Sequence, residues 1–205
     1  MIHIQCALEI SLEYPQSSFD EGAAKELVNV DKTVGYGFEF EGEYAITSDL
    51  LTTLGVSYNN TEIKDENVAI STCSFCTVLN PVDENGLISV DGLSLPRAPE
   101  WIGNFTMRYS TELGDGELYF YTDWSYASEV RFSLIDALEM RQDPYLEGGV
   151  RVGYLFMVDN YDVEVAGYGR NITDETALIG GVTINNLAGV VNQGRTWGAD
   201  VKVKF

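Results

Sequence analysis

Apolar and polar residues alternate with a period of two along most of this chain. The clearest case is the C-terminal stretch, where one parity holds Trp197, Ala199, Val201, Val203 and Phe205, and the other holds Gly198, Asp200, Lys202 and Lys204. Such alternation predicts a β-strand with one apolar and one polar face. The same pattern predicts further strands over 2–10, 34–44, 54–58, 101–110, 118–126, 146–156 and 161–170. No segment of useful length has an apolar period of 3.6 residues, so the pattern predicts an all-β, antiparallel fold of about eight strands.

The connections between these strands alternate in length. Long segments cover 12–32, 60–98, 127–144 and 171–193, whereas short turns cover 45–49, 112–116 and 157–160. Because successive antiparallel strands reverse direction, the long loops fall at one end of the sheet and the short turns at the other. Outer-membrane barrels have this asymmetry, with short periplasmic turns and long extracellular loops. The pattern therefore favours an antiparallel transmembrane β-barrel segment, with a soluble β-sandwich as the alternative.

Aromatic residues mark both ends of the apolar faces. The long-loop ends carry Tyr58, Trp101, Trp124, Tyr126 and Trp197, and the short-turn ends carry Tyr44, Tyr109, Phe156, Tyr161 and Phe205. Two aromatic belts around an apolar band suit a lipid bilayer, because amphipathic rings are stable at the headgroup level. The belts and the loop asymmetry together favour the membrane barrel over a sandwich whose core is aromatic at its ends.

The composition narrows the range of partners. The 205-residue chain carries 12 Lys and Arg against 32 Asp and Glu, which gives a formal net charge of −20. This excess of acid opposes nucleic-acid binding, which needs a basic face, and it opposes electrostatic docking onto anionic lipid. Residues 1–7 lack the basic and apolar regions of a signal peptide, so we expect either a cytosolic chain or a fragment of a longer protein.

Three stretches resemble motifs of the TonB-dependent outer-membrane receptors. Residues 168–175, Tyr-Gly-Arg-Asn-Ile-Thr-Asp-Glu, resemble the penultimate-strand motif, a hydrophobic strand that ends in Gly-Lys/Arg-Asn-Leu-Thr/Phe-Asp. Residues 194–205 resemble the terminal strand, which begins Pro-Arg-Thr-Tyr/Trp-Gly and ends in Phe, with Gly194 where Pro is usual. Residues 34–41 resemble the family's Gly-Val-Glu-Leu-Glu strand. The resemblance implies that the family motifs and barrel closure rest on Arg170, Asn171, Asp174, Arg195, Thr196, Trp197, Gly198 and Phe205.

The resemblance also implies a place in a larger protein. The family's barrel has about 22 strands around a plug, so residues 1–205 would be the C-terminal part of that barrel, without the plug domain and the N-terminal strands. The implied location is the outer membrane of a Gram-negative bacterium. The implied partners are outer-membrane lipid, the plug domain and remaining strands of the parent receptor, TonB through the missing N-terminal part, and the barrel-assembly machinery through the C-terminal strand.

The implied function is TonB-dependent uptake of a siderophore or another large nutrient. The choice of ligand would depend on the plug and on loops outside this chain. Two alternatives remain open. One is a self-contained eight-stranded outer-membrane barrel with an adhesin or structural role, because eight strands can close around a lumen filled by side chains. The other is a soluble β-sandwich that binds sugars through its aromatic residues.

Few residues suggest chemistry of their own. Cys73 and Cys76 form a Cys-x-x-Cys in the longest loop, where we expect a disulfide that stiffens an external loop. The other readings are a redox motif, which needs a helix N-terminus, and a zinc site, which needs two more ligands. Cys6 is expected to be an apolar strand residue. His3 is the single histidine and a poor candidate for a general base, so we expect neither enzyme activity nor a cofactor.

Charged residues gather on the polar parity of the strands: Glu39, Glu41, Arg108, Asp123, Glu147, Arg151, Glu164, Arg170, Asp200, Lys202 and Lys204. The antiparallel register around the 157–160 turn is expected to bring Arg151 near Glu164. In a barrel these side chains would line a wet lumen and face the plug, whereas in a soluble protein they would form a solvated face. The loop acids have no calcium-loop spacing, and we expect them to be solvated: Asp65, Glu66, Asp83, Glu84 and Asp91.

Overall fold

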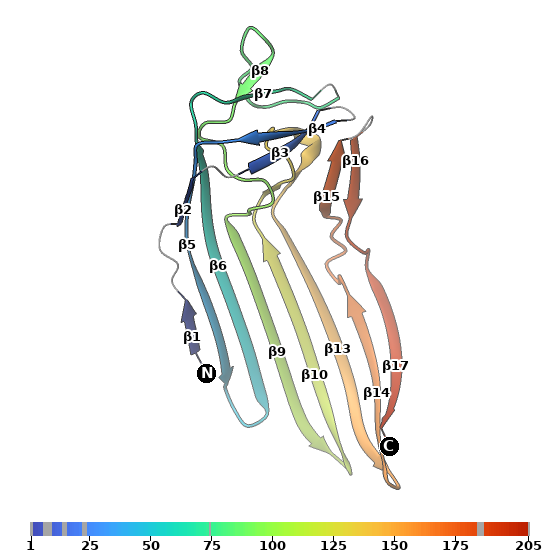
Figure 1. The fold of residues 1–205 in the computed structure, drawn as a ribbon. Helices are drawn as coiled ribbons and strands as arrows, with labels where there is room; N and C mark the ends of the chain where they lie inside the picture. The colour runs from blue at the N-terminus through green and yellow to red at the C-terminus, as the bar shows by residue number, and fades with distance from the viewer. Residues whose placement is uncertain are drawn as a thin grey trace.

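The computed structural model describes residues 2–5, 10–13, 16–21, 24–73, 75–183 and 187–204. One large antiparallel sheet dominates it (Figure 1), with the strand order β1-β5-β6-β9-β10-β13-β14-β17, and β2 also pairs with β5. The strands are β1 (Ile2–Gln5), β2 (Ile10–Glu13), β5 (Lys32–Ala45), β6 (Leu50–Lys64), β9 (Trp101–Leu113), β10 (Gly116–Ala127), β13 (Tyr145–Val158), β14 (Tyr161–Arg170) and β17 (Thr196–Lys204). The prediction of an all-β, antiparallel fold is confirmed.

Two strands differ from their predicted bounds by more than three residues. The strand predicted over 54–58 extends over the whole of β6, because the polar residues Asn59, Asn60 and Thr61 continue the pairing with β5. The strand predicted over 2–10 is represented by β1 and β2, which pair with opposite ends of β5. Cys6 and Phe205 lie outside the described residues.

The register keeps each parity on one face across the whole sheet. Arg108 stands directly opposite Tyr121, which stands opposite Arg151, which in turn stands opposite Tyr168. Directly paired residues point to the same side of a sheet, so the charged parity forms one continuous polar face. The other face carries Phe38, Leu54, Trp101, Tyr109, Tyr126, Val152, Val165, Trp197, Val201 and Val203, all exposed.

Aromatic rings cover glycines on neighbouring strands. A Cβ atom added to Gly148, Gly153, Gly169 or Gly198 would overlap the ring that stands directly opposite, which belongs respectively to Trp124, Tyr119, Trp197 and Tyr168. Because these positions have no side chain, the rings can lie flat against the sheet. Such pairs hold the register of a sheet that has no second layer packed on it.

Each long loop contains a two-stranded sheet of its own, which the sequence pattern did not predict. The pairs are β3 (Gln16–Glu21) with β4 (Ala24–Asn29), β7 (Ala69–Ser71) with β8 (Leu87–Ser89), β11 (Val130–Arg131) with β12 (Arg141–Gln142), and β15 (Leu178–Thr183) with β16 (Leu187–Val191). A short 3-10 helix, η1 (Leu138–Met140), precedes β12. All four pairs lie at the end of the sheet opposite the short turns (Figure 1).

The buried apolar core of the molecule lies among these loops. We define the loop cap as residues 65–98 and 128–142. Its core includes the tops of the neighbouring strands and consists of Val30, Ile63, Ile70, Ile88, Val90, Leu134, Ile135, Ala137 and Met140. Backbone hydrogen bonds join the two halves of the cap, from Leu79 N to Asp136 O (2.8 Å) and from Leu138 N to Thr77 O (3.1 Å). The two middle loops therefore fold as one unit.

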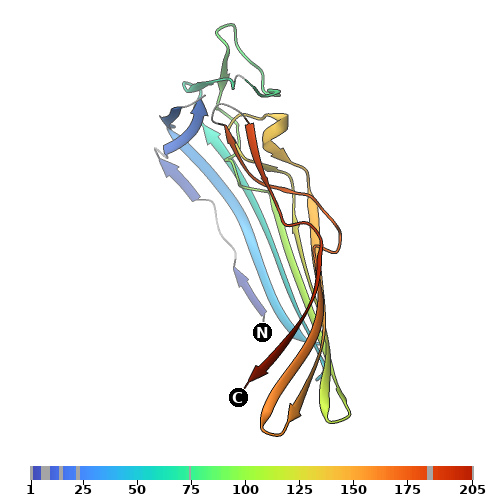
Figure 2. The same ribbon diagram turned by 90° about the vertical axis from the view of Figure 1, so that its right-hand side faces the viewer.

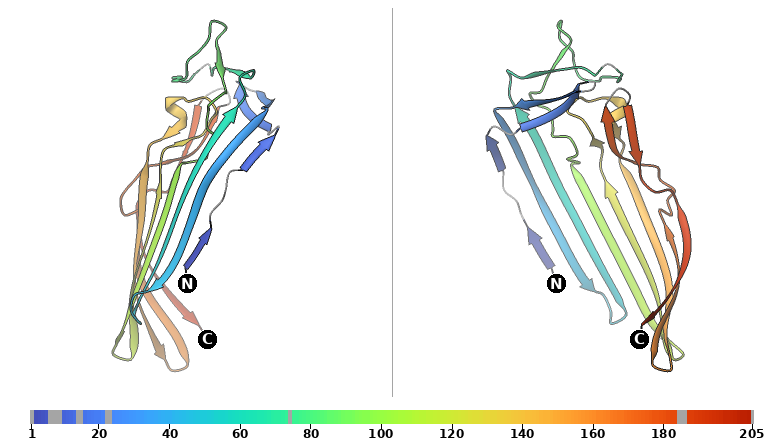
Figure 3. Two further views of the ribbon diagram at one scale, coloured as in Figure 1. Left: turned by 90° about the vertical axis from the view of Figure 1, so that its left-hand side faces the viewer. Right: turned by 45° about the vertical axis from the view of Figure 1, so that its right-hand side comes forward.

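The sheet is an open trough. Both edge strands, β1 and β17, curl toward the same side of the central strands (Figures 2 and 3). Among the described residues β17 pairs with β14 and not with β1 or β2, so the sheet does not close on itself. Nor does the described part of the chain hold a helix long and apolar enough to cross a membrane.

Candidate functional site

The polar face of the sheet centres on Arg151, in the middle of β13. Its guanidinium donates to Tyr119 Oη (2.6 Å), to both carboxylate oxygens of Asp200 (2.8 Å each) and to Glu164 Oε1 (2.7 Å). Tyr119 Oη in turn donates to Glu164. The predicted proximity of Arg151 and Glu164 is confirmed. One cation thus links three strands, β10 through Tyr119, β14 through Glu164 and β17 through Asp200.

Two further cations border this network. The Arg108 guanidinium lies 4.3 Å from the centre of the Tyr119 ring and pairs with Glu117 at 3.0 Å. Lys202 Nζ lies 3.4 Å from Glu164 Oε2. The cations at the centre of the polar face therefore already have partners within the sheet. The network stiffens the single-layered sheet, because its charged groups pair and form hydrogen bonds with one another.

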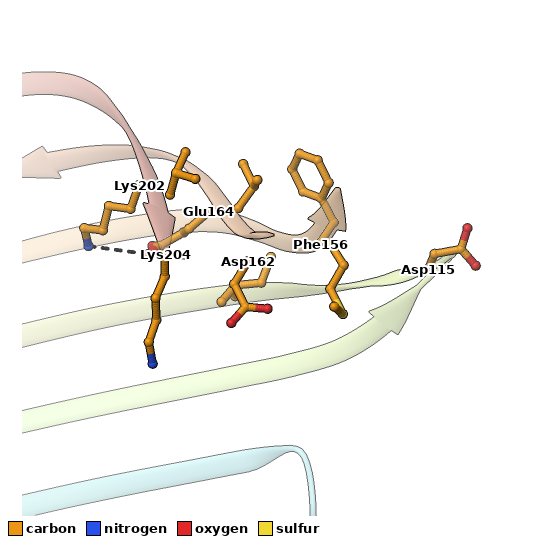
Figure 4. Close-up of a pocket in the computed structure, with 10 residues that line it drawn as sticks. Asp115, Phe156, Asp162, Glu164, Lys202 and Lys204 are labelled. Atoms are coloured by element: carbon orange, nitrogen blue, oxygen red, sulfur yellow. Dashed lines mark hydrogen bonds and ion pairs between the residues drawn. The ribbon is translucent and has the colours of Figure 1, made fainter. Parts of the chain in front are cut away.

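Two hollows flank the network on the polar face. The one toward the short turns has a volume of about 720 Å³ and is lined by Leu155, Met157, Asp162 and Lys204 among others (Figure 4). In it Lys202 reaches Glu164, whereas the Lys204 side chain points away from that pair.

The hollow toward the loops has a volume of about 430 Å³. Tyr121, Asp123, Glu147 and Arg170 contribute to its lining. The Arg170 guanidinium stands 5.7 Å from the centre of the Tyr168 ring. This end of the polar face carries positively and negatively charged side chains together with aromatic rings.

The motif at 168–175 forms a tight turn built on Asn171. Asn171 is 3% exposed and has a positive φ of 47°, a conformation that Asn tolerates better than most residues. Its Nδ2 donates to Glu175 O (2.8 Å) and Gln193 O (2.9 Å), and its Oδ1 accepts from Glu175 N (3.0 Å) and Thr173 Oγ1 (3.1 Å). The side-chain amide thereby joins the end of β14 to the residue just before the second motif.

The structure brings the two sequence motifs together at this turn. Arg195 forms an ion pair with Asp174 (3.0 Å), and Thr196 stands opposite Arg170 in the first β14–β17 pair. Trp197 covers Gly169, and the Tyr168 ring covers Gly198. Each motif supplies contacts that fix β17 on β14, which is a physical reason for the two motifs to occur in one chain. A role in barrel closure stays a proposal.

Sequence reasoning missed Asn192 and Tyr119. Asn192 Nδ2 donates to Glu147 Oε2 (2.7 Å) and Glu175 O (3.1 Å), and its Oδ1 accepts from Ala177 N (3.0 Å). It lies in a predicted loop, where no periodicity marks it. Tyr119 could have been noticed, because it is a large aromatic residue, like Tyr121, on the polar parity of its strand.

One loop acid, Asp65, is not solvated as predicted. Asp65 is 5% exposed, and its carboxylate accepts from Asp31 N (2.8 Å) and Asn67 N (2.9 Å), which holds its pKa below the usual range. Asp83 is exposed, and its carboxylate also accepts from Leu87 N and Asn85 N (2.8 Å each), which lowers its pKa. Both carboxylates hold loop backbone in place.

The cysteines lie at the edge of the cap core. The Cα atoms of Cys73 and Cys76 are 5.6 Å apart, a separation that a disulfide can span. The disulfide stays a prediction, to be tested by mass spectrometry after alkylation without reductant. Within the described ranges no group of three His, Cys, Asp or Glu residues could hold a metal ion.

Comparison with known proteins agrees with this architecture. A family model described as "TonB dependent receptor-like, beta-barrel" matches residues 10–172. The chain is similar in fold to the ferric yersiniabactin uptake receptor FyuA from Yersinia pestis, with 17% identity and a TM-score of 0.65 over 88% of this chain and 25% of that one. It is also similar to BauA, the ferric preacinetobactin receptor from Acinetobacter baumannii, with 16% identity and a TM-score of 0.66 over 96% and 26%.

A third similar structure is the siderophore receptor PiuA from Acinetobacter baumannii, with 15% identity and a TM-score of 0.64 over 95% of this chain and 24% of that one. The chain thus spans about a quarter of the length of these three proteins. At such identities the likeness shows the fold alone. No curated protein matches the sequence.

Proposed function

The chain belongs to the TonB-dependent receptor β-barrel family, and from this membership we propose that it forms the C-terminal part of an outer-membrane receptor that imports a siderophore or another large nutrient. The family consists of receptors and not of enzymes. Its barrels lie in the outer membrane, and its members contain a plug domain and interact with TonB. For this chain, contacts with a plug, with TonB and with the barrel-assembly machinery are part of the proposal.

The observation that carries the proposal is the division of the sheet into two faces. One face is apolar and exposed from β5 to β17, and the other carries the Arg151 network and its flanking charges. An exposed apolar face of this extent is stable against lipid and unfavourable against water. The polar face then borders a lumen, where hydrated charges are tolerated. All long loops lie at one end, as in a barrel with an extracellular side.

The first test is the DNA upstream of Met1. A continuous open reading frame that encodes a plug domain and additional strands would support the receptor. A signal peptide encoded directly before Met1 would contradict it and would favour the self-contained eight-stranded barrel.

The second test is functional. Deletion of the complete gene should reduce growth on iron-limited medium that contains one ferric siderophore as the iron source. Restoration of the gene should recover that growth. A second strain carries Arg151→Met in the restored gene. If the Arg151 network only stiffens the sheet, this variant should still be found in outer-membrane fractions. Growth that is unaffected by deletion with every chelate and nutrient tried would contradict an import function.

A further inference from the structure

One strip of the loop cap turns apolar side chains outward. Val78 pairs with Ala137 in an isolated antiparallel bridge, and the hydrogen bonds on either side join Leu79 to Asp136 and Leu138 to Thr77. Ala137 is buried and Val78 packs against the cap core. In paired strands neighbouring residues point to opposite sides. Leu79 and Leu138 therefore point away from the core on the same side.

Leu79 and Leu138 flank the same bridge, and two further exposed apolar residues, Phe75 and Val82, lie within four positions of Leu79 in the sequence. We call these four residues the cap patch. It consists of Phe75 (70% exposed), Leu79 (48%), Val82 (47%) and Leu138 (59%). Single exposed apolar residues are ordinary, but here four come from two segments that are hydrogen-bonded together over a buried core. The patch is thus presented on an ordered support, as interaction surfaces usually are.

Lipid does not explain this patch. The cap lies beyond the ends of the long strands, and the β7–β8 pair reaches farthest from the sheet (Figure 1). The aromatic residues at the loop ends of the strands, such as Trp101 and Trp197, mark the headgroup level. The cap patch lies past that level, on the side where the loops face water.

The charge around the patch is negative. Residues 65–98 contain four exposed acids, Glu66, Asp83, Glu84 and Asp91, besides the buried Asp65, and one cation, Arg97. Asp83 follows Val82 directly, and Glu139 follows Leu138. Thr77 holds the Glu139 carboxylate through its amide (2.8 Å) and its hydroxyl (2.7 Å), which lowers the pKa of Glu139 and keeps it ionised at neutral pH.

The nearby cations do not neutralise these acids. Arg131 donates to Ser94, and Arg141 pairs with Glu129 and lies 3.9 Å from Asp136. Both of these arginines are half-buried, whereas Arg97 is exposed and its amide donates to Arg131 O (2.7 Å). With eight acids against three arginines in residues 65–98 and 128–142, the cap is negatively charged.

We propose that the cap patch is a docking surface for a cationic, amphipathic polypeptide segment. Apolar side chains of the partner would cover Phe75, Leu79 and Leu138, and its Lys or Arg side chains would face Asp83, Glu84 and Glu139. This function is distinct from nutrient import and does not depend on which nutrient the parent receptor takes up.

The test measures binding of a fluorescein-labelled synthetic peptide of alternating Lys and Leu. The complete receptor of the proposed function is reconstituted in nanodiscs of phosphatidylcholine, because the isolated 205-residue chain is expected to associate through its sheet edges. Fluorescence anisotropy is corrected for binding to empty discs. The combined variant Phe75→Ser, Leu79→Asn and Leu138→Asn should weaken binding roughly tenfold or more, because it removes the apolar contact. The combined variant Asp83→Asn and Glu84→Gln should weaken binding and reduce its dependence on salt.

The matched control is Ile179→Asn with Val190→Ser, which removes equally exposed apolar residues (53% and 55%) from the β15–β16 pair. It should bind the peptide as the unmodified chain does, and all variants should show unchanged circular dichroism. Equal loss in the control would overturn the proposal, as would unchanged binding by the patch variant. Two other results would also overturn it. One is equal binding of a peptide with Glu in place of Lys, and the other is peptide that binds only to the empty discs.

Discussion

In the core of the loop cap Ile63, Ile70 and Ile88 are at most 1% exposed, whereas on the apolar face of the sheet Trp197 and Val201 are 67% and 65% exposed. The polar groups are distributed in the opposite sense. The sheet joins Arg151, Glu164, Asp200 and Lys202 in one network, and the cap carries most of its acids on the outside. Apolar side chains are therefore buried in the cap and exposed on the sheet of the same chain.

The difference reflects two solvents. A loop cap in water is held together by apolar burial, which contributes about 25 cal/mol for each Å² removed from water. A sheet in lipid gains nothing by hiding apolar side chains from its surroundings, and is held instead by backbone pairing, cross-strand contacts and lumen charges. The boundary between the two regions lies near the end of β6, where Ile63 already belongs to the cap core.

The unpaired edges of the sheet give the largest expected effect. In lipid each unpaired backbone group costs several kcal/mol, so an open sheet with free edges at β1 and β17 is not viable. We expect the isolated chain to associate through these edges after refolding into detergent micelles. Light scattering coupled to size exclusion measures this, and a monodisperse monomer with heat-modifiable migration would instead favour a self-contained barrel.

The next effect is expected in the cap core. Ile88→Ala should destabilise the cap by about 2–5 kcal/mol, because it leaves a cavity in a packed core. The matched control is Ile179→Ala on β15, where the side chain is exposed and little is lost. Hydrogen exchange read by mass spectrometry should speed up over residues 65–98 in the Ile88 variant alone. Uniform acceleration over the whole sheet would contradict a separately folded cap.

A charged residue introduced on the apolar face should lower the free energy of unfolding slightly less than the cavity in the cap core does. Val152 lies in the middle of β13 and points to the exposed face, so Val152→Arg should cost about 2–4 kcal/mol in a bilayer. Ser110→Arg is the control, because Ser110 lies on the polar face opposite Tyr119. Urea titration in lipid vesicles, at one protein concentration, compares the two variants. Equal tolerance at both positions would show that the assignment of the two faces to lipid and lumen is wrong.

The lumen network should show a smaller effect. Arg151→Met leaves Glu164 and Asp200 without their shared donor, at a cost of about 1–3 kcal/mol. Arg108→Met, in a more exposed pair with Glu117, should cost under about 1 kcal/mol. The same urea titration gives both values. If the two arginines contribute equally, the network is only a set of solvated surface pairs.

The two regions also differ in how far the sequence predicts them. The strands follow from alternation because each has one face in each environment, and a slip of one residue would exchange the faces. The motif residues Asn171 and Arg195 were recognised from resemblance, but not their joint contacts, since Gln193 and Asn192 lie in a segment without periodicity. The cap was read as loops because Ile70, Ile88 and Ile135 are scattered over 66 positions and meet only through tertiary pairing.

The smallest predicted effect is a loss of protection against hydrogen exchange that acid causes in the cap. Asp65 is bonded to the amides of Asp31 and Asn67, so its pKa is lower in the folded cap than in the unfolded chain. A carboxyl group with a lowered folded pKa stabilises the fold above its unfolded pKa of about 4, and this contribution is lost as the pH falls further. We expect hydrogen exchange of the cap, corrected for intrinsic rates, to accelerate between about pH 5 and pH 3. Asp65→Asn should be less protected at pH 6 and should change less on acidification, whereas Glu66→Gln, at the exposed neighbouring position, should behave like the unmodified chain. An Asp65→Asn variant with the full acid response would show that this carboxylate does not hold the cap to Asp31, just before the start of β5.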